Sequence, residues 1–493
     1  MDEKRPAGRP ARHLALVASA LVVAGGLFGL TGGGSATGEA FPAPTPQAAC
    51  GPGAREETGI QGRVPQRDYD TGRVDRGYRC NTRGVAHQGA TGGFKVQRYR
   101  DDSGRVCAYY DSTLLFPKDV LMNAARGLGV IVLDMSDPSR PVKTDALVSP
   151  AMQSPHESVL VNNRRGLLAA VLGNAATNAG VLDVYDISED CRHPQLVSTT
   201  PTAVLGHESG WAPDGKTFWA ASAGGQTLTA IDVSDPAAPQ PVFFQSGVNY
   251  HGLRLSGDGR TMYVAEIGNP TDGSFASGGL RILDVSEVQD REPDPEVRLV
   301  SELDWPERSI PQVAEPFTRN GHPYLLEVDE FANYNFTSGQ DQSEAPVGAA
   351  RIIDIADPAN PRIVANLRLE VHQPAARRSS QQEDPGASSP VQGYAGHYCS
   401  LPRRTDPKLV ACSMIASGLR IFDISDLRSP VEVGYFNRPV RPGSKPANPT
   451  AEGGYAMSQP AWDVAHRQVW YSDGNRGFYA VRLTNGVGEL LAR

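Results

Sequence analysis

The chain has 493 residues, of which 40% are hydrophobic and 21% are charged, a balance that is typical of globular proteins. Its formal net charge is −8, so the overall electrostatic field gives no support for binding to nucleic acid. The 52 glycines and 39 prolines favour many turns and short strands over long helices.

The first forty residues predict a segment that directs export. A basic start, "MDEKRPAGRPARH", precedes the apolar run "LALVASALVVAGGLFGL" at 14–30, and small residues such as Ala36 and Ala40 follow it. This order is typical of a cleaved signal peptide, and an uncleaved N-terminal membrane anchor is the alternative. We expect 1–40 to be this segment, 41–79 to be a Pro/Gly-rich lead segment, and 80–493 to form the folded domain. The protein is then exported, extracellular or at the cell surface, and meets a membrane only through an uncleaved N-terminus.

Six cysteines follow the predicted leader, and no Cys-x-x-Cys motif occurs among them. An even count in an exported chain favours disulfides over a zinc or redox motif. Cys399 and Cys412 are expected to face each other across a hairpin. The remaining predicted pairs are Cys80–Cys107, joining an N-terminal strand to the first repeat, and Cys50–Cys191 by elimination.

A strand that ends in aspartate recurs along the chain, as in "GVIVLDMSDPSRPV" (129–142), "LTAIDVSDPAAPQPV" (228–242) and "GLRIFDISDLRSPVEV" (418–433). Two more strand-like runs precede the aspartate, for example in "HGLRLSGDGRTMYVAE" (251–266), and in most copies a fourth follows it. Repeats of this kind bury their faces against one another, and radial packing into a β-propeller is the expected solution. The repeated aspartates are Asp134, Asp186, Asp232, Asp284, Asp354 and Asp423.

The two ends of the chain predict how the ring closes. A seventh copy at 459–486 has Arg482 in place of the aspartate and lacks a fourth strand, while "CNTRGVAHQG" (80–89) reads as a strand without a repeat of its own. We therefore predict an all-β fold, a seven-bladed β-propeller of four-stranded antiparallel blades closed by an N-terminal strand. Six and eight blades are the alternatives.

The segments "GVIVLDMSDPSRPV", "GLRILDVS" and "GLRIFDISDLRSP" resemble the LVIVD repeat. Over 80–486 the chain is similar to LVIVD-repeat β-propeller proteins, which are exported, and this resemblance assigns no reaction. The Asp-Ile-Ser-Asp-Pro type of turn is also similar to turns of selenium-binding-protein-like propellers, some of which are copper-dependent methanethiol oxidases. The chain departs from the repeat pattern at "DVSEVQ" (284–289), which lacks Asp-Pro, and at Arg482.

The triplet His-Glu-Ser occurs in two neighbouring repeats, in "SPHESVLVNNRRGLLAAV" from Ser154 and in "LGHESGWAPDGKTFWAAS" from Leu205. When the repeats are aligned on their second strands, four histidines take matching places at the start of the first strand. The first strand is the innermost of a blade, so this place lies at the mouth of the central channel. The residues predicted there are His156, His207, His251, His397, Gln312 and Ser458.

Two interpretations of these histidines follow from their chemistry. In one, His156, His207, His251 and His397 bind one transition-metal ion (Cu, Zn or Fe) in the channel. Glu157 and Glu208 then act as further ligands or as hydrogen-bond partners of the ligands. In the other, each histidine donates to the carboxylate that ends the third strand and so ties the blade together.

Two other motifs need a structural context. "GWAPDGKT" (210–217) matches the phosphate-binding P-loop pattern, but the strand-like "TFWAAS" follows where a helix is required, so we predict a hairpin turn and no nucleotide. "YLLEVDEF" (324–331) places Glu327, Asp329 and Glu330 at the end of a second strand. A solvated edge is the favoured interpretation of these carboxylates, and a calcium site is the alternative.

The sequence does not identify catalytic residues. The expected function is that of an exported binding or scaffold protein, which presents its ring face and the loops 331–348 and 372–393 to a protein, a glycan or a small ligand. The alternative is a metal-dependent oxidoreductase or hydrolase centred on the histidines. Propellers serve both classes of function, so the fold alone does not decide.

Overall fold

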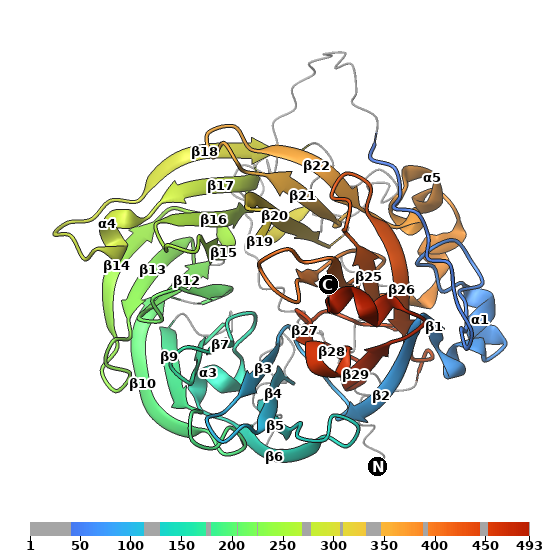
Figure 1. Cartoon of the computed structure of the whole chain (residues 1–493), viewed down its shortest axis with the longest axis horizontal. Coiled ribbons are helices and arrows are strands. Elements are labelled where there is room, and N and C mark those ends of the chain that lie inside the picture. Colours follow the sequence, from blue (N-terminus) through green and yellow to red (C-terminus); the bar gives the residue numbers. More distant parts are fainter. Residues whose placement is uncertain are drawn as a thin grey trace, which may run out of the picture.

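A computed structural model of the chain describes residues 41–112, 129–173, 179–204, 206–223, 225–268, 278–305, 309–331, 347–387, 393–443 and 452–492. Within these ranges, seven antiparallel sheets form blades around a central axis, and the first strand of each blade lies nearest the axis (Figure 1). The predicted seven-bladed propeller is therefore confirmed. The predicted leader, 1–40, lies outside the described residues.

In blades one to five the strands run outward from the axis in chain order, whereas blades six and seven add an N-terminal strand at their outer edges. Blade one contains β3 (Val96–Arg100), β4 (Val106–Asp111), β5 (Val130–Asp134) and β6 (Val142–Leu147). Blade two contains β7 (Leu160–Asn162), β8 (Leu167–Val171), β9 (Ala179–Asp186) and β10 (Gln195–Val204). Blade three contains β11 (Ser209–Trp211), β12 (Thr217–Ser222), β13 (Thr227–Asp232) and β14 (Gln240–Ser246). Blade four contains β15 (Tyr250–Leu255), β16 (Thr261–Glu266), β17 (Gly279–Asp284) and β18 (Arg298–Asp304).

Blade five contains β19 (Ile310–Arg319), β20 (His322–Glu330), β21 (Ala350–Asp354) and β22 (Arg362–Leu367). Blade six contains β23 (Tyr398–Ser400), β24 (Leu409–Ser413), β25 (Leu419–Asp423) and β26 (Val431–Asn437). Blade seven contains β27 (Ala461–Asp463), β28 (Gln468–Asp473), β29 (Gly477–Leu483) and, from the other end of the chain, β2 (Thr82–Gln88). The described helices are short: α1 (Gln66–Asp70), η1 (Arg73–Arg76), α3 (Pro150–Gln153), α4 (Ser286–Gln289), η3 (Glu370–His372), α5 (Pro374–Arg377), η4 (Ser380–Glu383), η5 (Pro385–Ala387), η6 (Val464–His466) and η7 (Val487–Leu491).

The N-terminal part of the chain closes the ring. β2 pairs antiparallel with β29, from Thr82 opposite Leu483 to Gln88 opposite Phe478, and supplies the outer strand that the last repeat lacks. This confirms the predicted closure. The structure adds a strand that the sequence did not predict, β1 (Tyr78–Cys80), which pairs with β26 as a fifth strand of blade six. The same stretch of chain therefore binds the outer edges of two neighbouring blades.

Alternating side chains of the central strands fill the spaces between blades. On β8, Leu168 and Ala170 pack toward blade one, whereas Leu167, Ala169 and Val171 pack toward blade three. Apolar residues on both faces explain why the second strands are buried along their whole length. Separate apolar clusters occupy the seven interfaces of the ring, including the one between blades seven and one.

The repeated aspartates end the third strands, as predicted, and their role is local. The carboxylate of each accepts the backbone N–H two residues on, as in Ser136 to Asp134 (2.9 Å) and Ser425 to Asp423 (2.7 Å). The same bond forms at the other four positions. A side chain that imitates a backbone turn fixes the change of direction into the fourth strand, which explains why this residue recurs.

The lead segment packs along the outside of blade six, beside α5 (Figure 1). Glu57 and Glu432 flank the fully buried Arg420 of β25, and Gln61 donates to Glu432 (2.9 Å). Arg63 forms an ion pair with Asp384 (2.7 Å). The described part of the predicted loop 372–393 is therefore a series of short helices bound to the lead segment, while 388–392 and 332–346 lie outside the described residues.

Three disulfides link the six cysteines, and one of the predicted pairs is correct. Cys399–Cys412 joins facing positions of β23 and β24. The predicted pairs Cys80–Cys107 and Cys50–Cys191 are wrong, because the bonds are Cys50–Cys80 and Cys107–Cys191. Cys80 lies in β1 on blade six, away from blade one. Cys191 follows β9, where its N–H is bound by Asp101 (3.2 Å) next to β4.

Removal of the Cys107–Cys191 bond by Ala substitution is expected to lower the free energy of unfolding by about 4 kcal/mol, and removal of Cys399–Cys412 by about 3 kcal/mol. The longer loop, 84 residues against 13, restricts the unfolded chain more. Urea unfolding followed by tryptophan fluorescence measures both values. The reverse order would contradict the prediction, and a non-reducing peptide map checks the pairing independently.

Candidate metal centre at the propeller axis

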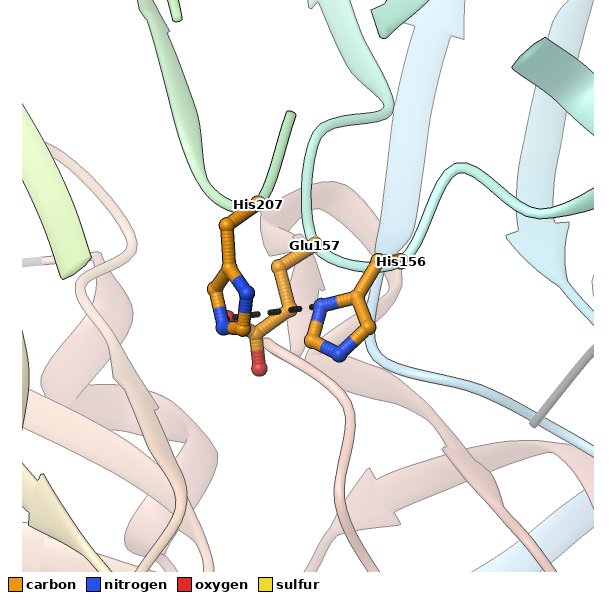
Figure 2. A group of neighbouring side chains, drawn as sticks. All are labelled: His156, Glu157 and His207. Carbon is orange, nitrogen blue, oxygen red and sulfur yellow. Dashed lines mark ion pairs between the residues drawn. The ribbon is translucent and has the colours of Figure 1, made fainter. Parts of the chain in front are cut away.

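The predicted histidines meet at one end of the axis. His156 and His207 precede the first strands of blades two and three, and Figure 2 shows their rings side by side next to Glu157, with ring centroids 4.2 Å apart. His156 has a positive φ of 50°, which non-glycine residues rarely adopt. Gly173 leaves room for this conformation, because a Cβ at that position would lie 2.5 Å from the Cβ of His156.

The side chain of Glu157 lies at the centre of the cluster. Its Oε2 lies 3.9 Å from Nδ1 of His156, 3.6 Å from Nε2 of His207 and 3.7 Å from Nε2 of His251. Its Oε1 lies 3.5 Å from Nε2 of His397. Blades two, three, four and six thus supply four imidazoles around a single carboxylate.

Blade five contributes the second carboxylate, Glu330, from the end of β20. Its Oε1 lies 3.1 Å from Nε2 of His251, and its Oε2 lies 2.8 Å from Nε2 of His397. Gln312 holds the cluster from β19, because its Nε2 donates to Glu157 Oε1 (2.7 Å) and its main-chain oxygen lies 3.2 Å from Nδ1 of His251. The ring orientations are therefore fixed by backbone and amide groups.

Aromatic rings and backbone oxygens hold the remaining histidines. Phe94 stacks on His156 and on His397, with ring centroids 4.6 and 5.5 Å apart. The main-chain oxygen of Met457 lies 2.6 Å from Nδ1 of His397, which leaves Nε2 facing the carboxylates. An imidazole that is bound through one nitrogen presents the other in a defined direction, as metal-ligating histidines do.

The cluster is buried apart from one ring. The side chains of His156, Glu157, His251, His397 and Glu330 are at most 6% exposed, whereas His207 is 22% exposed. Burial and the neighbouring imidazoles lower the pKa of His156 and His207 well below the usual value, so both are neutral near pH 7. Neutral imidazole is the form that binds metals. His207 marks the side from which the cluster is reached.

Carboxylates reverse the effect of burial at His251. Burial lowers its pKa, but Glu157 and Glu330 outweigh burial and raise the pKa to about 9. Burial raises the pKa of Glu330, but His251 and His397 outweigh it and lower the pKa to about 2. The metal-free site therefore contains an ion pair between His251 and Glu330, while burial raises the pKa of Glu157.

The donor atoms fit a transition-metal ion. Among the described residues, neither Nδ1 of His156 nor Oε2 of Glu157 has a hydrogen-bond partner, although both are buried. Buried polar atoms are normally satisfied, and these two lie 3.9 Å apart, where one bound ion would satisfy both. Two groups of ligand atoms lie within 4.8 Å of one another, His156–Glu157–His207 and Glu157–His251–Glu330. Imidazole and carboxylate donors without thiolate suit zinc, iron, nickel or copper.

A buried charged layer lies beside the cluster and includes Glu208, the second glutamate of the His-Glu-Ser triplets. Lys95 and Arg254 both bind Glu208, Arg254 through contacts of 3.0 and 3.1 Å. Arg254 also pairs with Glu315 (2.6 Å), and Tyr398 lies under Lys95 with its ring centroid 4.1 Å from Nζ. Glu208 is therefore neutralised by two cations and is not available as a ligand.

The sequence predicted most of the cluster. Its four histidines, Glu157 and Gln312 come together, while Ser458 accepts the N–H of Ser472 (2.8 Å) and links strands instead. The alternative role for the histidines, donation to the aspartates of the third strands, belongs to another residue, His322, whose Nε2 lies 2.8 Å from Asp354. The four rings of the cluster face glutamates.

Lys95 and Arg254 were missed as site residues, and Glu330 was considered only as part of an alternative calcium site. The position of Glu330 in its repeat could have revealed it. The second strand of a blade ends at the same end of the blade where the first strand begins, which places Glu330 beside the histidines. The favoured solvated edge at 327–330 is wrong, because Glu327 and Asp329 are buried and both bind Arg351, with Nη2 lying 3.0 Å from Asp329. "GWAPDGKT" forms the predicted hairpin, since β11 pairs directly with β12.

Comparisons with known proteins agree with the fold. The model of the LVIVD repeat matches residues 414–438, in blade six. Together with the seven blades, this match supports the description of the chain as an LVIVD-repeat β-propeller protein. No curated protein sequence matches the chain.

The solved structures that match the chain have low sequence identity and TM-scores below 0.5. Hydrazine synthase of Kuenenia stuttgartiensis is 13% identical, with a TM-score of 0.48, over 80% of this chain and 97% of that one. The periplasmic gluconolactonase PpgL of Pseudomonas aeruginosa is 14% identical, with a TM-score of 0.44, over 71% and 85%. The Cps50 (Swd1) propeller domain of Myceliophteria thermophila is 10% identical, with a TM-score of 0.47, over 82% and 100%.

Replacement of Glu330 by Gln in the metal-free protein is expected to lower the free energy of unfolding by about 3 kcal/mol at pH 6, because a protonated His251 loses its partner. The stabilisation from His251 is present below about pH 6.5 and is lost as the pH rises through about 9. That from Glu330 is present above about pH 4.5 and is lost as the pH falls through about 2. At pH 10 the cost should therefore fall below about 1 kcal/mol.

Denaturant unfolding of both proteins at pH 6 and pH 10 measures this difference, with chelator present throughout. Glu489→Gln, at an exposed position, serves as the control and should change little at either pH. An equal loss at both pH values would show that the ion pair does not stabilise the fold.

The charged layer predicts strong coupling between Lys95 and Glu208. Lys95→Met and Glu208→Gln are each expected to cost about 3 kcal/mol or more, because each leaves a buried charge with an incomplete partner. The loss of unfolding free energy in the double variant should be about 2 kcal/mol smaller than the sum of the losses in the two single variants. Urea unfolding of the three variants gives the coupling, with Lys216→Met as the exposed control. Additive losses would contradict the assignment.

Proposed function

We propose that this chain is an exported metalloprotein that holds a transition-metal ion at the axis of its propeller and serves as a metal-dependent enzyme. The observation that carries the proposal is the buried group of four histidines and two glutamates with unpartnered atoms at His156 and Glu157. A structural role does not account for it, because tying blades together does not require buried polar atoms without hydrogen-bond partners.

The composition of the group supports a reactive metal over a purely structural one. Structural zinc sites in proteins are closed and four-coordinate, whereas catalytic sites keep a position open to substrate. His207 is partly exposed, so one side of the group is within reach of a small molecule. A metal bound there supplies Lewis acidity or, if it is redox-active, electron transfer. The chain's own residues hold the donors in place and exclude most of the solvent.

Three disulfides support export. Bonds of this kind persist in oxidising compartments, outside the cell or in a periplasm. The proposed leader at 1–40 accounts for the route. Within the described ranges, no helix is long and apolar enough to cross a membrane.

Metal analysis of the full chain, purified without a histidine tag, tests the proposal. We expect about one equivalent or more of bound metal, and we expect it to be lost in His156→Ala/His207→Ala. His193→Ala, an exposed histidine outside the group, should retain the metal of the wild type. Zinc as the resident metal favours a hydrolase, and copper or iron favours an oxidoreductase.

The opposite result has a definite meaning. A protein without metal, whose melting temperature is unchanged by chelator, would overturn the enzyme proposal. It would favour the other expectation from the sequence, a scaffold that presents its ring face to a protein, a glycan or a small ligand.

A further inference from the structure

The group of ligands contains more donors than one catalytic metal ion uses. Three or four protein ligands are typical of such an ion. Six side chains converge here: His156, His207, His251, His397, Glu157 and Glu330. A single ion bound by all six would have no position left for a substrate.

The two oxygens of Glu157 divide these donors into two sets. Oε2 lies 3.9 Å from Nδ1 of His156, 3.6 Å from Nε2 of His207 and 3.7 Å from Nε2 of His251, whereas Oε1 lies 3.5 Å from Nε2 of His397. Glu330 lies with the second set, 2.8 Å from His397. The triads His156–Glu157–His207 and Glu157–His251–Glu330 share Glu157 alone. A carboxylate with a different oxygen directed at each set is the arrangement of a bridging ligand.

We infer that the propeller axis binds two metal ions, bridged by Glu157. This inference rests on the proposed function and extends it. One ion takes the side of His156 and His207, and the other takes the side of His397 and Glu330, with His251 between them. Two-metal sites place their ions about 3.5–4 Å apart and act on oxygen-rich substrates such as phosphate and carboxylic esters.

The charges of the site indicate the kind of substrate. Two divalent ions exceed the negative charge of Glu157 and Glu330. The nearby glutamates do not compensate, because Glu208 and Glu315 are bound by Lys95 and Arg254. This excess of positive charge favours a substrate with an anionic or strongly polarised oxygen group. Such a substrate would reach the site past His207.

Metal titration of the full-length, metal-free chain tests the inference. With Zn²⁺ we expect about two tightly bound equivalents by elemental analysis after gel filtration. With Co²⁺ we expect the electron paramagnetic resonance signal per ion to weaken when the second equivalent is added, because the two ions are then coupled. His156→Ala and His397→Ala should each keep about one equivalent and lose the coupling. His193→Ala should behave as the wild type.

The outcomes separate the two proposals. One equivalent in the wild type, without coupling, overturns the two-metal inference and leaves the metalloprotein proposal standing. No bound metal overturns both. If either alanine variant fails to fold, the glutamine variant at the same position, His156→Gln or His397→Gln, replaces it, and the wild-type stoichiometry decides without any variant.

Discussion

Each blade of this protein has two apolar faces, and neither face can be covered except by the next blade. That constraint closes the ring, because seven interfaces need seven partners, including the one between the last blade and the first. Closure then directs the first strand of every blade toward a common axis. Polar side chains at these strand ends are largely shielded from bulk solvent, so they must form hydrogen bonds and ion pairs with one another.

The axis meets this requirement in two different ways. Lys95 and Arg254 neutralise Glu208, so this layer is complete within the protein. The neighbouring layer is not complete: Nδ1 of His156 and Oε2 of Glu157 are buried there without a hydrogen-bond partner. Two glutamates from the same sequence triplet thus have opposite roles. The difference is set by which side chains lie across the axis from each glutamate, and it is the reason why we propose a metal in the layer of histidines.

The sequence was sufficient for the architecture, because the aspartate turns repeat and each repeat has the same four runs. It was also sufficient to align the four histidines, since equivalent positions in a ring face the same axis. It did not reveal β1, because three residues after a lead segment carry no repeat pattern. The pairing of Cys50, Cys80, Cys107 and Cys191 depends on which loops meet in space. Glu330 was visible as one of three acidic residues, but its separation from Glu327 and Asp329 depends on Arg351, which lies on the next strand.

The closing strand has a consequence for how the protein is made. β2 is synthesised before every blade, but its partner β29 is among the last segments to be synthesised. Until that segment is available, blade seven is incomplete, blades one and six each lack a neighbour, and the central side chains remain open to water on one side. Assembly of the axis is therefore a late event in the life of the chain, and the metal that we propose would be bound after the polypeptide is complete and β2 has paired with β29.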